Sequence, residues 1–168
     1  SHNPKEYNGY KVYNSLGCQI TDEAAKAITE KINEYDYFND FTPNKALIEV
    51  LGDSVKTAFI KAIKAFSLTE ITEANAPSIV YSPLHGTGRK YVQAILKEIG
   101  IKEVNTVKEQ EMPDGNFTTC PYPNPEEKAA LTLALRDAEI YKPDLVMATD
   151  PDGDRVGIRI APSYIRLY

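Results

Sequence analysis

Short apolar segments alternate with amphipathic helical segments between residues 78 and 160, and this alternation restricts the fold more than any other feature. The apolar segments read SIVYSP, EVNTVK and LVMATD, and helical patterns at 89–99 and 125–140 separate them. A succession of strand, helix and strand builds a mainly parallel sheet with helices on its faces. A further apolar segment, RVGIRI at 155–160, follows LVMATD after a short turn. We therefore predict an α/β domain with a mixed, mainly parallel sheet flanked by helices.

The first forty residues follow a different pattern. The segment YNGYKVYN at 7–14 predicts a turn at Asn8 and Gly9 followed by a strand. Residues 21–35 predict a helix with Thr21 as its N-cap. One strand and one helix do not close a core, so this part is interpreted as the end of a first domain. The predicted domains are residues 1–42 and residues 43–168.

Composition and charge narrow the classes of partner. The chain has 19 Lys and Arg against 24 Asp and Glu, which gives a formal net charge of −5 without a basic block. This balance argues against nucleic acid or an anionic membrane as a partner. No membrane-span-length apolar run or signal-peptide pattern is present, and the distant Cys18 and Cys120 give no disulfide framework or zinc spacing. We expect a reduced, soluble, cytoplasmic protein.

Three aspartates, Asp150, Asp152 and Asp154, alternate in the turn between the last two apolar segments. Unit charges about 5 Å apart repel by roughly 3 kcal/mol at an effective dielectric near 20. A turn with this repulsion needs a cation or full solvation. Oxygen donors at this spacing suit a hard divalent cation, and three of them leave positions open for a phosphoryl oxygen or water. The alternative is a solvated acidic turn, because Asp, Pro and Gly are common turn residues.

An EF-hand also begins D-x-D-x-D, but this loop departs from that pattern twice. Arg155 stands where the invariant Gly is required, and Ala161 stands where a bidentate Glu is required. Arg155 would instead add a bidentate phosphate donor beside the cation.

A glycine-containing turn, SPLHGTGR at 82–89, links the first apolar segment to a helix. Such a turn lets backbone approach a ligand, and the helix N-terminus favours an anion. No G-K-[ST] follows, so it is not a Walker loop. A purely structural tight turn is an equal alternative. His85 lies in this turn, and a lone histidine is more often structural than catalytic.

The chain opens SHNPKEYNGYK, which places Ser1 before His2 and Asn3 and ahead of Lys11. A serine with polar neighbours and a lysine can act as an activated nucleophile. The alternative is an ordinary loop at a frayed end, and spacing alone favours that alternative.

Together these segments resemble the α-D-phosphohexomutase superfamily of phosphoglucomutases and phosphomannomutases. Members carry a phosphoserine loop T-A-S-H-N-P followed by N-G-x-K, and a metal loop D-x-D-x-D-R in their second domain. Here SHNP, NGYK and DPDGDR occur in that order. The segments YSPLHGTG and DGNFTTCPYPNPEE are similar to the phosphoglucomutase–phosphopentomutase branch. The resemblance implies the end of domain 1, with the phosphoserine loop, followed by domain 2, with the metal-binding loop.

The resemblance also implies roles for individual residues. It implies a Mg²⁺ site whose ligands are a phosphoserine oxygen of Ser1 and the carboxylates of Asp150, Asp152 and Asp154. It implies that Ser1 carries the transferable phosphoryl group and that Lys11 is the general base. It places Arg155 near the phosphoryl group, with His2 and Asn3 as polar residues of the phosphoserine loop.

The implied reaction interconverts sugar 1-phosphate and 6-phosphate, with glucose favoured, through a phosphoserine and a bisphosphate intermediate. The substrate would be a hexose phosphate. A phosphomannomutase or phosphopentomutase of the same fold is an alternative, as is a non-catalytic Mg²⁺- or phosphate-binding α/β module. Superfamily members have a third domain that reads the sugar hydroxyls and a fourth that grips the non-transferred phosphate. This stretch has neither, so we expect it to have little mutase activity alone.

Overall fold

The structure, a computed structural model, describes residues 2–7, 9–36 and 38–160. These residues form two compact units. One comprises the described part of 9–52, and the other joins residues 2–7 to residues 53–160. The larger unit contains the sheet, and the predicted domain boundary between residues 42 and 43 stays a prediction.

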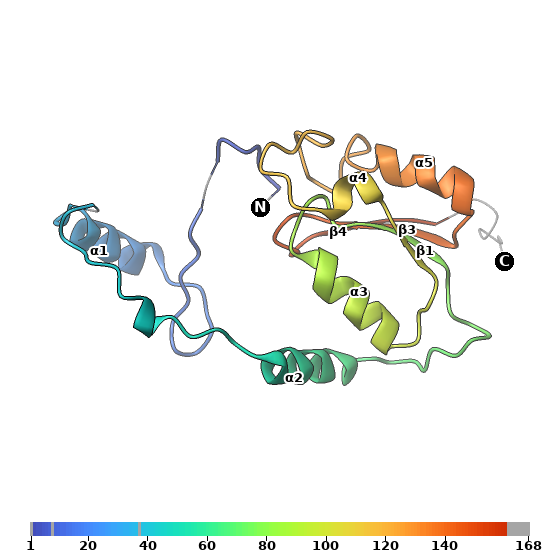
Figure 1. The fold of residues 1–168 in the computed structure, drawn as a ribbon, viewed down its shortest axis with the longest axis horizontal. Coiled ribbons are helices and arrows are strands. Elements are labelled where there is room, and N and C mark those ends of the chain that lie inside the picture. The colour runs from blue at the N-terminus through green and yellow to red at the C-terminus, as the bar shows by residue number, and fades with distance from the viewer. Residues whose placement is uncertain (1, 8, 37, 161–168) are drawn as a thin grey trace. The chain divides into compact units, whose positions relative to one another are not determined.

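The larger unit is an α/β domain built on one sheet (Figure 1). Its helices are α2 (Asp53–Lys64), α3 (Gly88–Glu98), α4 (Lys108–Glu111) and α5 (Thr132–Tyr141). Its strands are β1 (Ile79–Ser82), β2 (Val104–Thr106), β3 (Leu145–Thr149) and β4 (Val156–Ile160). The strand order is β2-β1-β3-β4, in which β1 pairs parallel with β2 and β3, and β4 pairs antiparallel with β3. The predicted mixed, mainly parallel sheet is confirmed.

Helices cover both faces of the sheet, with α3 on one face and α4 and α5 on the other (Figure 1). Successive side chains of a strand point to opposite faces. Ile79 and Tyr81 of β1 therefore pack with Leu96 of α3, and Val80 packs with Ala134 of α5. All four residues of β1 are buried, so β1 is the centre of the core.

The strand order brings the loops after β1 and β3 to the same edge of the sheet. The two strands are parallel neighbours, with Ser82 opposite Ala148 at their carboxyl ends. The chain leaves β1 through α3 to reach β2 on one side, whereas β3 lies on the other side. This change of direction is a topological switch point, where open α/β sheets bind their ligands.

The smaller unit contains α1 (Asp22–Ile32) and a short 3₁₀ helix, η1 (Lys45–Leu47). Thr21 caps α1 as predicted, because its side chain accepts a hydrogen bond from Ala24 N at 3.4 Å. The strand predicted within 7–14 is wrong. In the described part of that segment only Tyr13 forms a β-bridge, with Gln19. Asn8 of the predicted turn lies outside the described residues.

The last helix begins later than the sequence predicts. The pattern at 125–140 predicts a helix that starts at residue 125, but α5 begins at Thr132 and the preceding residues form turns. Asn124 caps one of these turns, where its Oδ1 accepts from Glu126 N at 3.1 Å. A Cβ added to Gly157 would lie 2.1 Å from the Pro125 carbonyl oxygen, so the Pro125 backbone packs directly on β4. This tertiary contact overrides the local helix signal.

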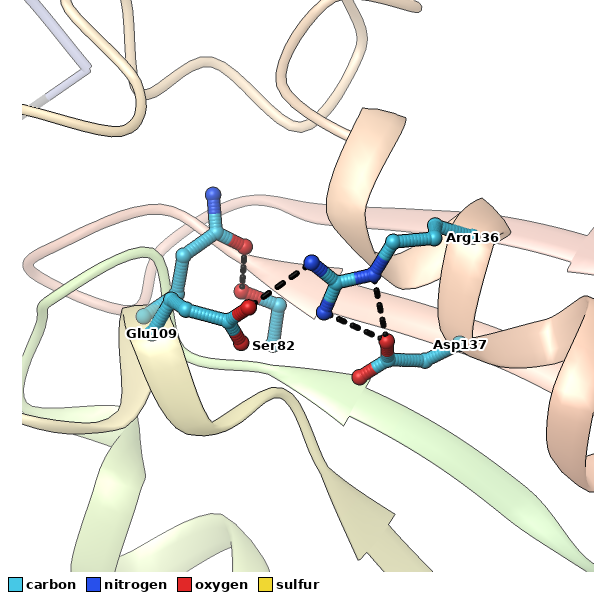
Figure 2. Close-up of polar contacts among 5 residues, drawn as sticks. Ser82, Glu109, Arg136 and Asp137 are labelled. Atoms are coloured by element: carbon cyan, nitrogen blue, oxygen red, sulfur yellow. Dashed lines mark hydrogen bonds and ion pairs between the residues drawn. The ribbon is translucent and has the colours of Figure 1, made fainter.

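The single turn of α4 was not predicted, and polar contacts hold it to β1 and α5 (Figure 2). Ser82 Oγ donates to Gln110 Oε1 at 2.7 Å, and both residues are buried. Arg136 donates to Glu109 Oε1 at 2.7 Å and, through Nε and Nη2, to Asp137 Oδ1 at 2.9 and 2.6 Å. The hydrogen bond from Arg136 lowers the pKa of Glu109. These contacts fix α4 at the carboxyl end of β1.

Replacement of Ser82 by Ala tests this link. The Ser82 hydroxyl donates to Gln110 and accepts from Leu84 N at 3.1 Å, so its loss leaves buried polar groups unpaired. We expect Ser82→Ala to lower the free energy of unfolding by about 1–3 kcal/mol in urea denaturation. The control is Ser67→Ala, since Ser67 is exposed and its hydroxyl bonds the nearby Thr69 carbonyl. Equal effects of the two variants would contradict the prediction.

Candidate metal centre

A buried carboxylate begins the loop after β3. Asp150 has no exposed surface. Its Oδ1 accepts from Arg155 N at 3.0 Å, whereas its Oδ2 is buried without a hydrogen-bond partner among the described residues. A buried ionised oxygen without a partner costs several kcal/mol. A cation at this oxygen would remove that cost.

Two further aspartates complete an acidic cluster. Asp150, Asp152 and Asp154 each offer a carboxylate oxygen, and these oxygens lie within 4.8 Å of one another. Gly153, at φ 80°, donates its N–H to the Asp150 carbonyl at 3.0 Å and so bends the loop. Burial raises the pKa of Asp150, and the neighbouring Asp152 and Asp154 carboxylates raise it further. The unpartnered oxygen and the all-oxygen donor set fit a hard divalent cation with open coordination positions.

The glycine turn after β1 packs directly against this aspartate loop. A Cβ added to Gly86 would lie 2.3 Å from Pro151 Cα, so only glycine allows this approach. Thr87 donates to the Pro151 carbonyl oxygen twice, from N at 2.8 Å and from Oγ1 at 3.2 Å. These contacts explain the glycine at 86 by loop packing and favour the structural interpretation of this turn.

A second buried contact fixes the residue that precedes Asp150. Thr149 Oγ1 and Tyr81 OH form a buried hydrogen bond of 2.8 Å. A Cβ added to Gly88 would lie 2.3 Å from the Tyr81 hydroxyl and 2.6 Å from Thr149 Oγ1. Burial raises the pKa of Tyr81 to about 12, so it stays neutral. The residue before the aspartate loop, Thr149, is therefore held in place by contacts with β1 and with the start of α3.

His85 supports a different loop, residues 112–120. Its ring is buried, and Nδ1 donates to the Met112 carbonyl oxygen at 2.8 Å. Nε2 then accepts from Thr119 Oγ1, also at 2.8 Å. Both ring nitrogens are occupied within the fold, so His85 has a structural role.

Hydrogen bonds between residues of loop 112–120 also hold it in its conformation. Asp114 accepts hydrogen bonds from Asn116 N at 2.9 Å and Thr118 N at 2.8 Å. These bonds, the Thr118 backbone bond first, lower the pKa of Asp114 to about 2. Phe117, at φ 48°, sets its ring edge-on to His85 with centroids 6.0 Å apart.

The other predicted site residues lie in different places. Ser1 lies outside the described residues. In the larger unit His2 is half-buried and Asn3 is exposed. Lys11 is exposed and belongs to the smaller unit. Arg155 contributes its backbone N–H to Asp150, while its guanidinium donates to Glu126 Oε1 at 3.2 Å.

Sequence analysis missed several residues that make long-range contacts in the larger unit. Thr87 holds the Pro151 carbonyl, and Glu126 pairs with Arg155. Lys5 Nζ donates to Asn116 Oδ1 at 3.1 Å across a sequence separation of 111 residues. Contacts at such separations leave no periodic signal in the sequence. The short spacing of the aspartates, by contrast, is a local pattern.

The fold and the aspartate loop define an α/β domain with a cluster of three carboxylates at its switch point that could hold a cation. The family model described as phosphoglucomutase/phosphomannomutase, alpha/beta/alpha domain II, matches residues 57–161. The corresponding domain I model matches residues 1–38. The chain belongs to the phosphoglucomutase/phosphomannomutase family.

Individual relatives agree with this membership. A phosphoglucomutase of Staphylococcus saprophyticus is 38% identical over 94% of this chain and 29% of its own length. A phosphomannomutase of Mycoplasmoides pirum is 36% identical over 98% of this chain and 31% of its own length. A crystal structure described as a putative phosphomannomutase from Thermus thermophilus superposes with a TM-score of 0.73 at 26% identity, covering 95% of this chain and 34% of that one.

The chain therefore spans about a third of the length of the relatives that it matches. Within the described residues, no helix has both the length and the apolar character needed to cross a bilayer.

Replacement of Gly86 by Ala tests the packing of the two loops. The added Cβ would overlap Pro151 Cα, so we expect a loss of about 1–3 kcal/mol in the free energy of unfolding. The control is Gly52→Ala, because a Cβ there meets nothing within 4 Å. Urea denaturation of the two variants would measure the loss. A Gly86→Ala protein as stable as the control would contradict the prediction.

The hydrogen bonds to Asp114 in loop 112–120 should make the free energy of unfolding depend on pH. The pKa of Asp114 is lowered from 3.8 to about 2 in the folded chain. Its stabilising contribution is therefore present above about pH 4 and is lost as the pH falls towards 2. We expect the stability difference between wild type and Asp114→Asn to shrink over this range in urea denaturation. A difference that stays constant or widens at low pH would show that the carboxylate is not held as described.

Proposed function

We propose that the chain is part of a Mg²⁺-dependent phosphohexomutase that interconverts sugar 1-phosphate and 6-phosphate. The observation that carries the proposal is the buried, unpartnered Oδ2 of Asp150, which has no hydrogen bond from the described residues and lies within a cluster of three carboxylates. Its location at the switch point of the sheet and the family membership support the same conclusion. The proposed enzyme class is an intramolecular phosphotransferase, an isomerase, that is itself a phosphoprotein.

The proposed roles follow the sequence resemblance. Ser1 would carry the phosphoryl group, and Asp150, Asp152 and Asp154 would hold Mg²⁺ with a phosphoserine oxygen. When bound, Mg²⁺ supplies positive charge that neutralises the phosphoryl oxygens. Arg155 would add a second positive charge near the same group.

Phosphoryl transfer then runs in two half-reactions. In the first, a bond forms between the phosphorus and a sugar hydroxyl oxygen while the phosphorus–oxygen bond to Ser1 breaks. The hydroxyl proton passes to Lys11 as general base and from there to the released Ser1 oxygen. The product is a sugar bisphosphate. In the second, the Ser1 oxygen forms a bond to the other phosphorus, the bond from that phosphorus to the sugar oxygen breaks, and the sugar oxygen takes up the serine proton. His2 and Asn3 would orient the serine within the phosphoserine loop.

The substrate proposed is a glucose phosphate. Mannose and pentose phosphates are the alternatives, since relatives of this chain are named phosphoglucomutase, phosphomannomutase and phosphopentomutase. We further propose that residues 1–42 end a first domain, that 43–168 form the second, and that the protein is cytoplasmic. A non-catalytic module that binds Mg²⁺ or phosphate would have the same aspartate cluster but no mutase activity.

Intact mass of the full-length protein as isolated tests the phosphoserine. We expect a fraction with the added mass of one phosphate, mapped by peptide sequencing to the serine of SHNP. We also expect interconversion of glucose 1-phosphate and glucose 6-phosphate. A protein with neither the phosphate nor the activity would contradict the proposal and favour the non-catalytic module.

Mg²⁺ binding is tested separately by thermal unfolding. At about a hundredfold excess over Kd, Mg²⁺ should raise Tm of the wild-type protein by about 5 °C. Asp152→Ala should abolish the rise. Glu30→Ala, which removes an exposed acidic side chain on α1, should keep it. An equal rise in Asp152→Ala and wild type would place the cation elsewhere.

A further inference from the structure

Hydrogen bonds hold loop 112–120, called the platform here, at the carboxyl edge of the sheet. His85, which lies in the turn after β1, holds it through the Met112 carbonyl and the Thr119 hydroxyl. Asp114 closes its turn and bonds the backbone N–H of Asn116 at 2.9 Å. The position of Asn116 is therefore set by the core of the domain, although its own side chain is exposed.

The N-terminal segment reaches this platform through Lys5. Tyr7 N donates to the Pro4 carbonyl oxygen at 3.0 Å, which closes a tight turn around Lys5. The proline restricts its own φ to about −65° and so limits the freedom of the turn. Lys5 Nζ donates to Asn116 Oδ1 at 3.1 Å. This bond joins residues 2–7 to the platform, and both belong to one compact unit.

The turn after β1 contacts both the platform and the aspartate loop. His85 supports the platform, and the next residue, Gly86, packs against Pro151 between Asp150 and Asp152. Ser1 precedes Lys5 by four residues, a length that spans at most about 14 Å when fully extended. Anchoring Lys5 therefore limits the volume available to the serine and lowers the entropic cost of bringing it to the reacting geometry.

We propose that Asn116 and Lys5 are positioning residues that dock the phosphoserine segment on loop 112–120. The inference rests on the proposed function, because it assigns Ser1 the phosphoryl group. Neither side chain contacts the reacting atoms in this assignment. Their effect is on the rate of phosphoryl transfer, since the sugar-binding groups are untouched.

Double-mutant kinetics of the full-length enzyme tests the pair. Asn116→Ala and Lys5→Met should each lower kcat about threefold to tenfold with KM for the sugar phosphate little changed. The double variant should lose no more than either single variant, because both remove the same bond. Asn116→Asp keeps the acceptor oxygen and should restore kcat to near the wild-type value.

A surface lysine elsewhere provides the control. Lys102 is exposed and pairs with Glu73, so Lys102→Met should leave kcat unchanged. All variants should keep the wild-type Tm within about 1 °C, as exposed substitutions usually do. If the wild-type enzyme is active, three results would overturn this inference alone. They are additive losses of kcat in the double variant, unchanged kcat in both single variants, and no recovery of kcat in Asn116→Asp. A wild type without phosphoserine and mutase activity would overturn the proposed function, and this inference with it.

Discussion

One buried carboxylate oxygen, Oδ2 of Asp150, requires positive charge beside it at this edge of the sheet. The oxygen has no hydrogen-bond partner among the described residues, and burial together with Asp152 raises the pKa of its carboxyl group. Such a group is stable in its ionised form only beside positive charge. With Asp154, the carboxylates form an arrangement that is costly without a cation and well suited to one.

The fold places this cluster by close packing. The strand order puts the loops after β1 and β3 side by side, and glycine at 86 lets the first loop touch Pro151 of the second. Thr87 then binds the Pro151 carbonyl, and the Tyr81–Thr149 hydrogen bond fixes the strand end. The turn after β1 therefore contacts both of the loops beside it. It holds the aspartate loop on one side and, through His85, loop 112–120 on the other.

The sequence predicts what depends on local pattern and misses what depends on tertiary contact. Strand and helix periodicity predicts the mixed sheet, and the spacing of the aspartates predicts their convergence, because both are properties of neighbouring residues. The start of α5 is predicted too early because the Pro125 carbonyl packs on Gly157. The Lys5–Asn116 bond joins residues 111 positions apart, so no window of sequence contains it. The His2, Asn3, Lys11 and Arg155 roles come from the resemblance and stay predictions.

A divalent cation at Asp150 is the central element of the proposed site. The most direct measurement is anomalous diffraction from a crystal of the full-length protein grown with Mn²⁺, a cation that prefers the same oxygen ligands as Mg²⁺. We expect one strong peak in contact with Asp150 Oδ2 and with the carboxylates of Asp152 and Asp154. The absence of a peak there, with Asp150 Oδ2 hydrogen-bonded to a protein group instead, would contradict this expectation.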